Sequence, residues 1–326
     1  MPMILAIDGG GTKTHLGLFD LEGRLLYQAI GTGCNHQSLG VETYQMVIQT
    51  LIQDALDAKD LKLNQITYAH LGISGADLPE DFDRLNQATK HILGDIPFTI
   101  ENDAWLILRS GLKTPFGAVA ICGTGTNSAA MNKDGQKAIL RSLGFTLGIY
   151  GGGLDIARES LHYAFRAEEL TYKHTRLMDE IPKILHVDQM SDVVHLFYPT
   201  PRINRHDLGK ITALAFKLAN EGDEVSIEII SRVGMFLGYQ TAGVIKQVHA
   251  EHEDIPVVIG GRVFEEGSHH LIDSMKHYLT QEIPKAYLVR PIYIPMVGAY
   301  LRALDHLGIK QDELIDKHLE ETRIKR

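Results

Sequence analysis

Cysteine and clusters of basic residues are scarce in this sequence. Its 326 residues include two cysteines, Cys34 and Cys122, which lie in separate Gly-rich stretches. They form neither a CxxC motif nor a disulfide framework, which is typical of proteins in a reducing cytoplasm. The formal net charge is -9, and no block of Lys and Arg is present. We therefore expect neither nucleic acid nor an anionic membrane as a partner.

Long apolar runs are also missing. No window reaches the roughly 20 apolar residues of a membrane helix. The opening letters MPMILAIDGG lack the basic flank and apolar stretch of a signal peptide, so we expect a cytoplasmic protein. Hydrophobic residues make up 44% of the chain and charged residues 22%, as in ordinary globular proteins. Because 326 residues exceed what one hydrophobic core usually organises, we expect two domains.

The sequence does contain an unusual glycine turn, in ILAIDGGGTKTHLGLFD. An apolar strand ends on Asp8, turns through three glycines and resumes as a second strand. Strand interiors select against Asp, and consecutive glycines cost conformational entropy. The bare backbone, the Thr12 and Thr14 hydroxyls and the Lys13 ammonium all suit phosphate oxygens. Asp8 would repel phosphate unless a cation lay between them, and Mg²⁺ held through water fits that place. A plain tight hairpin is the alternative interpretation.

The same pattern recurs later in the chain. GAVAICGTGTNSAAMNKDGQKAIL repeats the strand, glycine turn and strand, and IPVVIGGRVFEEG echoes ITYAHLGISGADLPED. A chance likeness of glycine turns explains one such pair, but two pairs in the same order favour a duplication. We expect two similar α/β domains whose glycine turns face one cleft. Two such turns suit a triphosphate. The spacing matches neither the Walker nor the Rossmann motif.

Six stretches occur in an order that resembles a known family: IDGGGTKT, GCNH, LGISGADLPEDF, ENDA, GTGTN and VVIGGRVF. The sequence resembles the N-acetylglucosamine kinase and BadF/BadG/BcrA/BcrD ATPase family of the actin, Hsp70 and sugar-kinase superfamily. The resemblance implies an α/β fold of two RNase H-like (actin-like ATPase) domains with an interdomain nucleotide cleft. The first would span 1–115 and be completed by a C-terminal helix over 298–326. The second would span 116–297 and carry a helical insert.

By this resemblance the ligands are ATP, Mg²⁺ and a small sugar. Mg²⁺ would be held through water by Asp8. The sugar-facing residues would be Asn35, His36, Ser74 and Gly75, with Asp77 beside them, although Asn35 would otherwise be an ordinary turn residue and His36 a packing residue. The implied ATP-binding residues lie in three glycine turns: Gly10, Gly11, Thr12 and Lys13; Gly123, Thr124, Gly125, Thr126 and Asn127; Gly260 and Gly261.

Asp103 is the candidate catalytic residue. It follows an apolar strand and precedes a helix, so its side chain should project where α/β proteins bind ligands. Its position is also that of an ordinary helix N-cap. The family match places it at the catalytic aspartate, which accepts the proton of the sugar hydroxyl. The resemblance thus implies an ATP-dependent kinase that phosphorylates a hydroxyl of a sugar or amino sugar, with Asp103 as general base and as a substrate-binding residue.

One region departs from the family pattern. Where the family has a stretch like GGWG…GDEGS, this chain has RSLGFTLGIYGGGLDIA, so Ile149 and Tyr150 occupy the acidic positions. Losing a carboxylate should weaken hydrogen bonding to a sugar hydroxyl, which leaves the identity of the sugar open. Two other functions stay open: an ATPase activator of the BadF type and a sensor that binds ATP and sugar without transfer. The placement of the cysteines argues against the activator. Homodimers are common among enzymes, and the oligomeric state also stays open.

Overall fold

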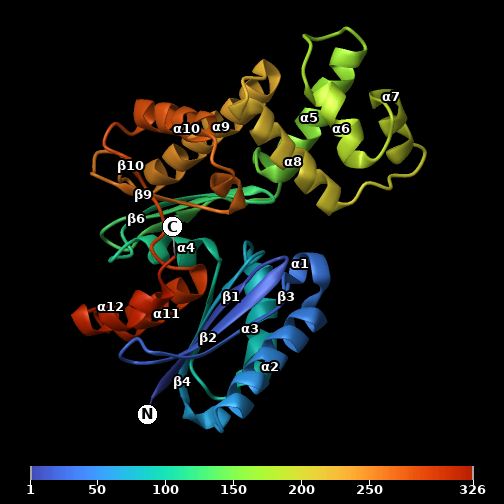
Figure 1. Ribbon diagram of the computed structural model, residues 1–326. Coiled ribbons are helices and arrows are strands. Elements are labelled where there is room, and N and C mark those ends of the chain that lie inside the picture. The colour runs from blue at the N-terminus through green and yellow to red at the C-terminus, as the bar shows by residue number, and fades with distance from the viewer. Residues whose placement is uncertain (1, 325–326) are drawn as a thin grey trace. The chain divides into compact units, whose positions relative to one another are not determined.

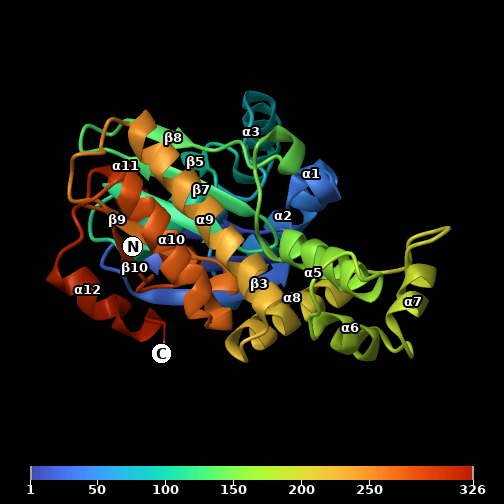
Figure 2. The same ribbon diagram turned by 90° about the horizontal axis from the view of Figure 1, so that it is seen from above.

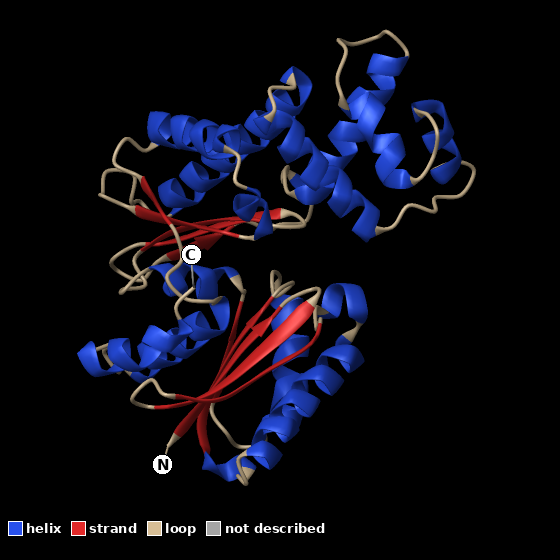
Figure 3. Ribbon diagram, viewed as in Figure 1, coloured by secondary structure: helices blue, strands red, loops and turns tan. Residues whose placement is uncertain are grey.

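The computed structural model describes residues 2–324, which belong to two compact units (Figure 1). Unit 1 runs to Val119 and resumes at Val289, and unit 2 spans Ala120–Leu288. Each unit is built on one five-stranded sheet with helices packed against it (Figure 3). None of the helices within residues 2–324 combines the length and the apolar character of a membrane span.

The sheet of unit 1 has the strand order β3-β2-β1-β4-β5. The glycine turn joins β1 to β2 as an antiparallel hairpin, and β3 extends it on the same side. On the other side, β4 and β5 run parallel to β1 and β4 respectively, so their carboxyl ends meet at one edge of the sheet. The strands are β1 (Met3–Gly9), β2 (Lys13–Asp20), β3 (Leu25–Thr32), β4 (Ile66–Ile73) and β5 (Phe98–Glu101).

Helices cover both faces of this sheet because its central strands are apolar on both sides. Leu5 and Ile7 of β1 pack toward one hydrophobic cluster, and Ile4 and Ala6 toward the other, as the alternation of a strand requires. The first face carries α2 (Val41–Ala58) and α3 (Pro79–Leu93), preceded by the short α1 (His36–Leu39); the second carries α4 (Ala104–Gly111) and α11 (Pro295–Leu307), with α12 (Glu313–Leu319) after it (Figure 1).

The single helix expected over 298–326 is wrong. Instead, α11 begins at Pro295 and ends at Leu307, and α12 begins after a break. The cause is Gly308, which adopts the left-handed conformation (φ 69°) that ends a helix. The expected domain boundaries, 115/116 and 297/298, stay predictions, and residues 325–326 of the expected helix lie outside the described residues.

Unit 2 repeats the arrangement of unit 1. Its strand order, β10-β9-β6-β7-β8, again places the first strand at the centre, the next two on one side and the last two on the other. The predicted duplication of the α/β fold is therefore confirmed by the topology. The strands are β6 (Gly117–Cys122), β7 (Thr126–Met131), β8 (Lys137–Ile139), β9 (Pro256–Gly260) and β10 (Tyr287–Val289).

The long helical region lies between β8 and β9. Its last helix, α9 (Glu224–Gln247), packs on β7 and on α10 (His269–Glu282), which follows β9. The other helices form an insert, whose α6 and α7 extend away from the sheet of the unit (Figure 2). They are α5 (Gly153–Glu168), α6 (Leu177–Leu185), α7 (Met190–Val193) and α8 (Arg205–Asn220). The helical pattern is interrupted before α8 at the two prolines, Pro199 and Pro201, as predicted.

Candidate functional site

The first glycine turn closes the β1–β2 hairpin and leaves part of its backbone open. The amide of Gly10 donates to the carbonyl of Lys13 at 2.9 Å, and the amide of Cys34 donates to the carbonyl of Gly10 at 3.0 Å. Gly11 and Thr12 are exposed, and a Cβ at Gly11 would meet no atom within 4 Å. The turn thus presents bare backbone at the edge where β1, β4 and β5 end, which is the arrangement that binds phosphate oxygens.

Two carboxylates lie beside this turn. Burial raises the pKa of Asp8, on β1, to about 6, against the opposing charge of Lys13. Burial also raises the pKa of Asp103, just after β5, to about 7, and the negative charge of Asp8 adds to this rise. The Ala104 amide and the Ser74 hydroxyl act in the opposite direction, because they stabilise the carboxylate of Asp103. Two mutually repelling, poorly hydrated carboxylates are typical of a catalytic centre or a cation site.

Asp103 does not act as a side-chain cap of α4. It occupies the N-cap position, but its carboxylate makes no capping hydrogen bond. The neighbouring Asn102 accepts from the Ala104 amide at 3.0 Å through Oδ1 and donates to Asp77 Oδ1 at 2.8 Å through Nδ2. The side chain that accepts a hydrogen bond from the first amide of α4 is therefore that of Asn102, not that of Asp103. The sequence motifs gave no indication of this role for Asn102. The Asp103 carboxylate is left beside Ser74 and Asp8.

The predicted sugar-facing residues of unit 1 come together. Asn35 begins α1 by accepting from the Gln37 amide at 3.0 Å, and its Nδ2 donates to Ser74 Oγ at 3.4 Å. Gly75 has φ 86°, and a Cβ there would lie 3.0 Å from the amide atoms of Asn35. His36 is different: it is 7% exposed, and its Nε2 lies 2.9 Å from Asp81 Oδ1. The imidazole therefore points into the protein, as its packing alternative predicted.

Asp77 also lies in this neighbourhood. Its pKa is raised to about 6, chiefly by burial and then by the charges of Asp103 and Asp81. Unit 1 therefore gathers three carboxylates of raised pKa, on Asp8, Asp77 and Asp103, next to an exposed glycine turn. Sequence motifs indicated each residue separately, and the parallel pairing of β1, β4 and β5 explains why they meet.

The second glycine turn, in unit 2, joins β6 to β7 and supports the start of α5. The amide of Gly153 donates to the Gly123 carbonyl at 2.8 Å, and the amide of Leu154 to the Thr124 carbonyl at 3.1 Å. Gly152 has φ 89°, and a Cβ there would lie 2.5 Å from Gly125 Cα. Only glycine permits this approach. Thr124 and Gly125 are exposed at the tip of the turn.

The remaining predicted ATP-binding residues lie around this turn. The side chains of Thr126 and Asn127 are buried: the Thr126 hydroxyl donates to the Tyr150 carbonyl at 3.1 Å, and Asn127 Oδ1 accepts from the Ser128 amide at 2.8 Å. Gly261, with φ 98°, is pressed against the end of β6, where a Cβ would lie 2.3 Å from the carbonyl oxygen of Cys122. Gly260 ends β9. The second and third glycine turns are thus neighbours in unit 2.

Ile149 and Tyr150 are packing residues of unit 2. Both are buried, and the Tyr150 ring lies 4.6 Å from that of Phe236. Ile149 lines a cavity of about 120 Å³ beside Thr124, together with Asp155 and Arg158 of α5. The two positions that carry acids in the family pattern therefore hold apolar contacts here.

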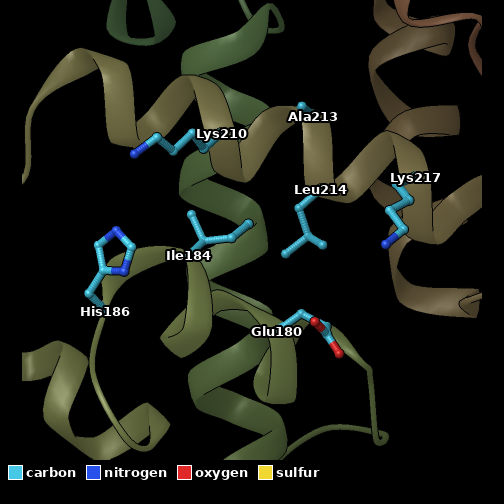
Figure 4. A pocket seen from close by; sticks show the side chains of 7 residues that line it. All are labelled: Glu180, Ile184, His186, Lys210, Ala213, Leu214 and Lys217. Carbon is cyan, nitrogen blue, oxygen red and sulfur yellow. The ribbon is translucent and has the colours of Figure 1, made fainter.

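A larger hollow lies between α6 and α8, and none of the predicted site residues lines it (Figure 4). It has a volume of about 530 Å³ and an apolar floor that includes Ile184 and Leu214. Lys210 at its rim is paired with Asp207 of its own helix at 3.3 Å. The other charged or titratable residues that line it are Glu180, His186 and Lys217.

A further cluster lies between β4, β5 and α11. His70, Glu101 and His306 bring three potential metal-ligand atoms within 4.8 Å of one another. However, the Arg302 guanidinium donates to both oxygens of Glu101, at 2.8 and 2.7 Å. The cluster is therefore a buried ion pair that joins β5 to α11, because the carboxylate is already engaged by the arginine fork.

The duplicated α/β units, with glycine turns at their strand ends, have the actin-like fold that the resemblance implied. Residues 5–303 match the model of the BadF/BadG/BcrA/BcrD ATPase family, and the chain belongs to this family. The use of ATP follows from membership of an ATPase family.

Individual proteins resemble the chain over nearly its whole length. It is 28% identical over 319 residues to "N-acetyl-D-glucosamine kinase" of Dictyostelium discoideum, covering 93% of this chain and 98% of that protein. It is 24% identical over 291 residues to "N-acetylmuramic acid/N-acetylglucosamine kinase" of Clostridium acetobutylicum, covering 89% and 94%. A solved structure from Chromobacterium violaceum, described as a candidate N-acetylglucosamine kinase, aligns with TM-score 0.70 at 18% identity and covers 93% and 98%. The structural likeness confirms the predicted fold.

Proposed function

We propose that the protein is an ATP-dependent kinase that phosphorylates a hydroxyl of a sugar or amino sugar. The observation that carries this proposal is the state of Asp103: a carboxylate at the end of β5, with a pKa of about 7, that makes no capping bond. A general base works best when its pKa lies near the operating pH. Two relatives with names of N-acetylglucosamine kinases, which match nearly the full length, support the same activity.

In the proposed reaction, Asp103 accepts the proton of the sugar hydroxyl as the oxygen attacks the γ-phosphorus of ATP and the bond to the β-phosphate oxygen breaks. The Ser74 hydroxyl lies near Asp103 and stabilises its charged form, which lowers the pKa of the carboxyl against the effect of burial. Asn35, Ser74, Gly75 and Asp77 would offer donors and acceptors to the other sugar hydroxyls.

The exposed turns would bind the nucleotide. Gly11 and Thr12 are exposed in unit 1, and Thr124 and Gly125 are exposed in unit 2; the backbone and hydroxyl groups of either turn would suit phosphate oxygens. Asp8 fits a magnesium site, since it offers hard oxygen ligands and is a partly buried carboxylate of raised pKa that a cation would stabilise. When bound, Mg²⁺ would neutralise part of the negative charge on the phosphate groups of ATP.

One observation bears on each of the two alternative functions, the BadF-type activator and the non-catalytic sensor. Both cysteines are buried, and burial raises the pKa of Cys34 to about 11 and of Cys122 to about 12, so neither provides the accessible thiolate that an iron–sulfur cluster requires. This disfavours the BadF-type activator. The buried Ile149 and Tyr150 keep a non-catalytic sensor as the second candidate.

The test is a coupled ADP-release assay with ATP and Mg²⁺ on a panel of sugars. The panel contains glucose, N-acetylglucosamine, N-acetylmannosamine and N-acetylmuramic acid, with product identified by mass spectrometry. We expect ADP release that depends on one of these sugars and a phosphorylated sugar as product. ATP hydrolysis that is indifferent to sugar would favour a plain ATPase. Sugar binding without ADP release would favour the sensor.

A further inference from the structure

Two loops carry the residues proposed to face the sugar, and they follow strands that are not neighbours in the sheet. The first sugar loop, 33–40, follows β3, and the second sugar loop, 74–78, follows β4. In the sheet, β2 and β1 lie between β3 and β4. Three strand spacings amount to about 14 Å. Each loop is bonded to the first glycine turn, through the Cys34 amide to the Gly10 carbonyl at 3.0 Å and the Ser74 amide to the Gly9 carbonyl at 2.8 Å, but direct contact between the loops depends on side chains.

Asp81, in the first turn of α3, contacts both loops. From the first sugar loop, His36 Nε2 lies 2.9 Å from Asp81 Oδ1, and Gln37 Nε2 donates to Oδ2 at 3.0 Å. From the second sugar loop, the amides of Leu78 and Asp77 donate to Oδ2 at 3.0 and 3.4 Å. Asp81 is 6% exposed, so these groups replace water around its carboxylate.

The electrostatics agree with this geometry. Burial alone would raise the pKa of Asp81, but the hydrogen bonds from His36, the Leu78 amide and Gln37 outweigh it and lower the pKa. The carboxylate is therefore stabilised in its charged form, in contrast to Asp8, Asp77 and Asp103, whose pKa values are raised.

Capping of α3 explains only part of this arrangement. Leu78 is the N-cap residue and its side chain has no polar atom, so the bond from its amide to Asp81 serves the helix end. The bonds from His36 and Gln37 serve no helix end of α3, because both residues belong to α1. They connect the first sugar loop to the second.

A second connection leads from the loops to Asp103. Asn35 Nδ2 donates to Ser74 Oγ at 3.4 Å, and the Ser74 hydroxyl lies near enough to the Asp103 carboxylate to lower its pKa. If the loops separated, the Asn35–Ser74 contact would be lost and Ser74 would be free to move relative to Asp103.

We propose that Asp81 is a positioning residue for the sugar: by bonding to both sugar loops at once, it holds them in the one arrangement that binds the substrate. The inference rests on the proposed function for the identity of the ligand. Neither the motifs nor the resemblance assigns a role to Asp81.

The test compares Asp81→Asn with Glu80→Gln. Glu80 is the preceding residue in the first turn of α3, is exposed, and its substitution removes the same charge from the same helix end. Amide hydrogen exchange is measured in the segments 33–40 and 74–78, and the KM values for N-acetylglucosamine and for ATP are measured in parallel. If another member of the panel is the better substrate, that sugar replaces N-acetylglucosamine.

We expect exchange to accelerate about tenfold or more in both segments of Asp81→Asn, because one or more charge-assisted hydrogen bonds are lost. The KM for the sugar should rise by a similar factor while the KM for ATP changes less than about twofold, and Glu80→Gln should resemble the wild type. Gln37→Ala removes one bond from an exposed residue of the first loop, so both segments should exchange faster by a smaller factor. If Asp81→Asn does not fold, the exchange rates of Gln37→Ala test whether the bonds to Asp81 join the two loops.

Three results would overturn the inference: acceleration confined to 74–78, which is the signature of a helix cap; unchanged exchange in both segments; or an equal rise in the KM for sugar and ATP. A wild-type protein that phosphorylates no sugar would refute the proposed function instead, and the exchange data alone would then decide whether Asp81 joins the loops.

Discussion

Replacing Asp103 by Asn should abolish sugar phosphorylation and at the same time stabilise the protein. A positioned general base contributes about 10²- to 10⁴-fold to a rate, so turnover should fall at least 100-fold. Asn keeps the size and one oxygen of the side chain but has no basicity. The ATP-binding turns are untouched, so the Kd for ATP should change little.

The stability gain follows from the pKa of Asp103, which is raised from 3.8 to about 7 by burial and by Asp8. The folded state therefore binds a proton between these two pH values more tightly than the unfolded state does, and stability falls as the pH rises through this window. Above pH 7 the full shift corresponds to about 4 kcal/mol of destabilisation. An uncharged Asn avoids it. The gain should shrink as the pH falls below 7 and vanish below about pH 4.

The assay is urea unfolding of wild type and Asp103→Asn at pH 8 and pH 4, without nucleotide and with EDTA present. A larger free energy of unfolding for the variant at pH 8, and near-equal values at pH 4, would support the reasoning. A variant that is no more stable than wild type at pH 8 would show that the carboxylate is well solvated. More than one-tenth of wild-type turnover would remove Asp103 from the role of base.

Three further predictions concern other parts of the two units. Asp8→Asn should raise the Mg²⁺ concentration for half-maximal activity at least about tenfold; an unchanged Mg²⁺ titration would refute the assignment. Gly152→Ala, at φ 89°, should raise the KM for ATP about tenfold through backbone strain, whereas Gly209→Ala, with open space around its Cβ, should not; equal effects on the KM would contradict this. Arg302→Met should lower the free energy of unfolding by about 3–5 kcal/mol, because it leaves Glu101 charged and buried; denaturant titration measures this, and a loss below 1 kcal/mol would contradict it.

Local patterns determined most of the fold. Each unit begins with an apolar strand, a glycine turn and a second strand, and this order of elements is enough to indicate both the duplication and the edge proposed to bind ligands. The break in the C-terminal region was missed because Gly308 lies within a stretch of otherwise good helix formers, where one glycine is often tolerated.

The site was less predictable, because its arrangement depends on side chains that meet across long stretches of chain. His36 and Asp81 are 45 residues apart, and Asn102 and Asp77 are 25 apart. No periodicity of the sequence records such a pair. Burial of single side chains was also hard to predict. Thr126 is among the implied ATP-binding residues, and its side chain is buried because it begins β7, whose six residues are all buried.

The two units share a strand order but differ in the residue that ends the first strand before the glycine turn. Aligning IDGGGT with ICGTGT places Cys122 of unit 2 where unit 1 has Asp8. Cys122 is fully buried and lies beneath Gly261, and burial raises the pKa of its thiol to about 12, so it packs as a small neutral side chain. A second carboxylate there would need its own cation to offset burial. The proposed mechanism needs one cation and one base, and both are assigned to unit 1. In unit 2, the second glycine turn keeps the exposed backbone that suits phosphate, but it has no carboxylate at the position that corresponds to Asp8.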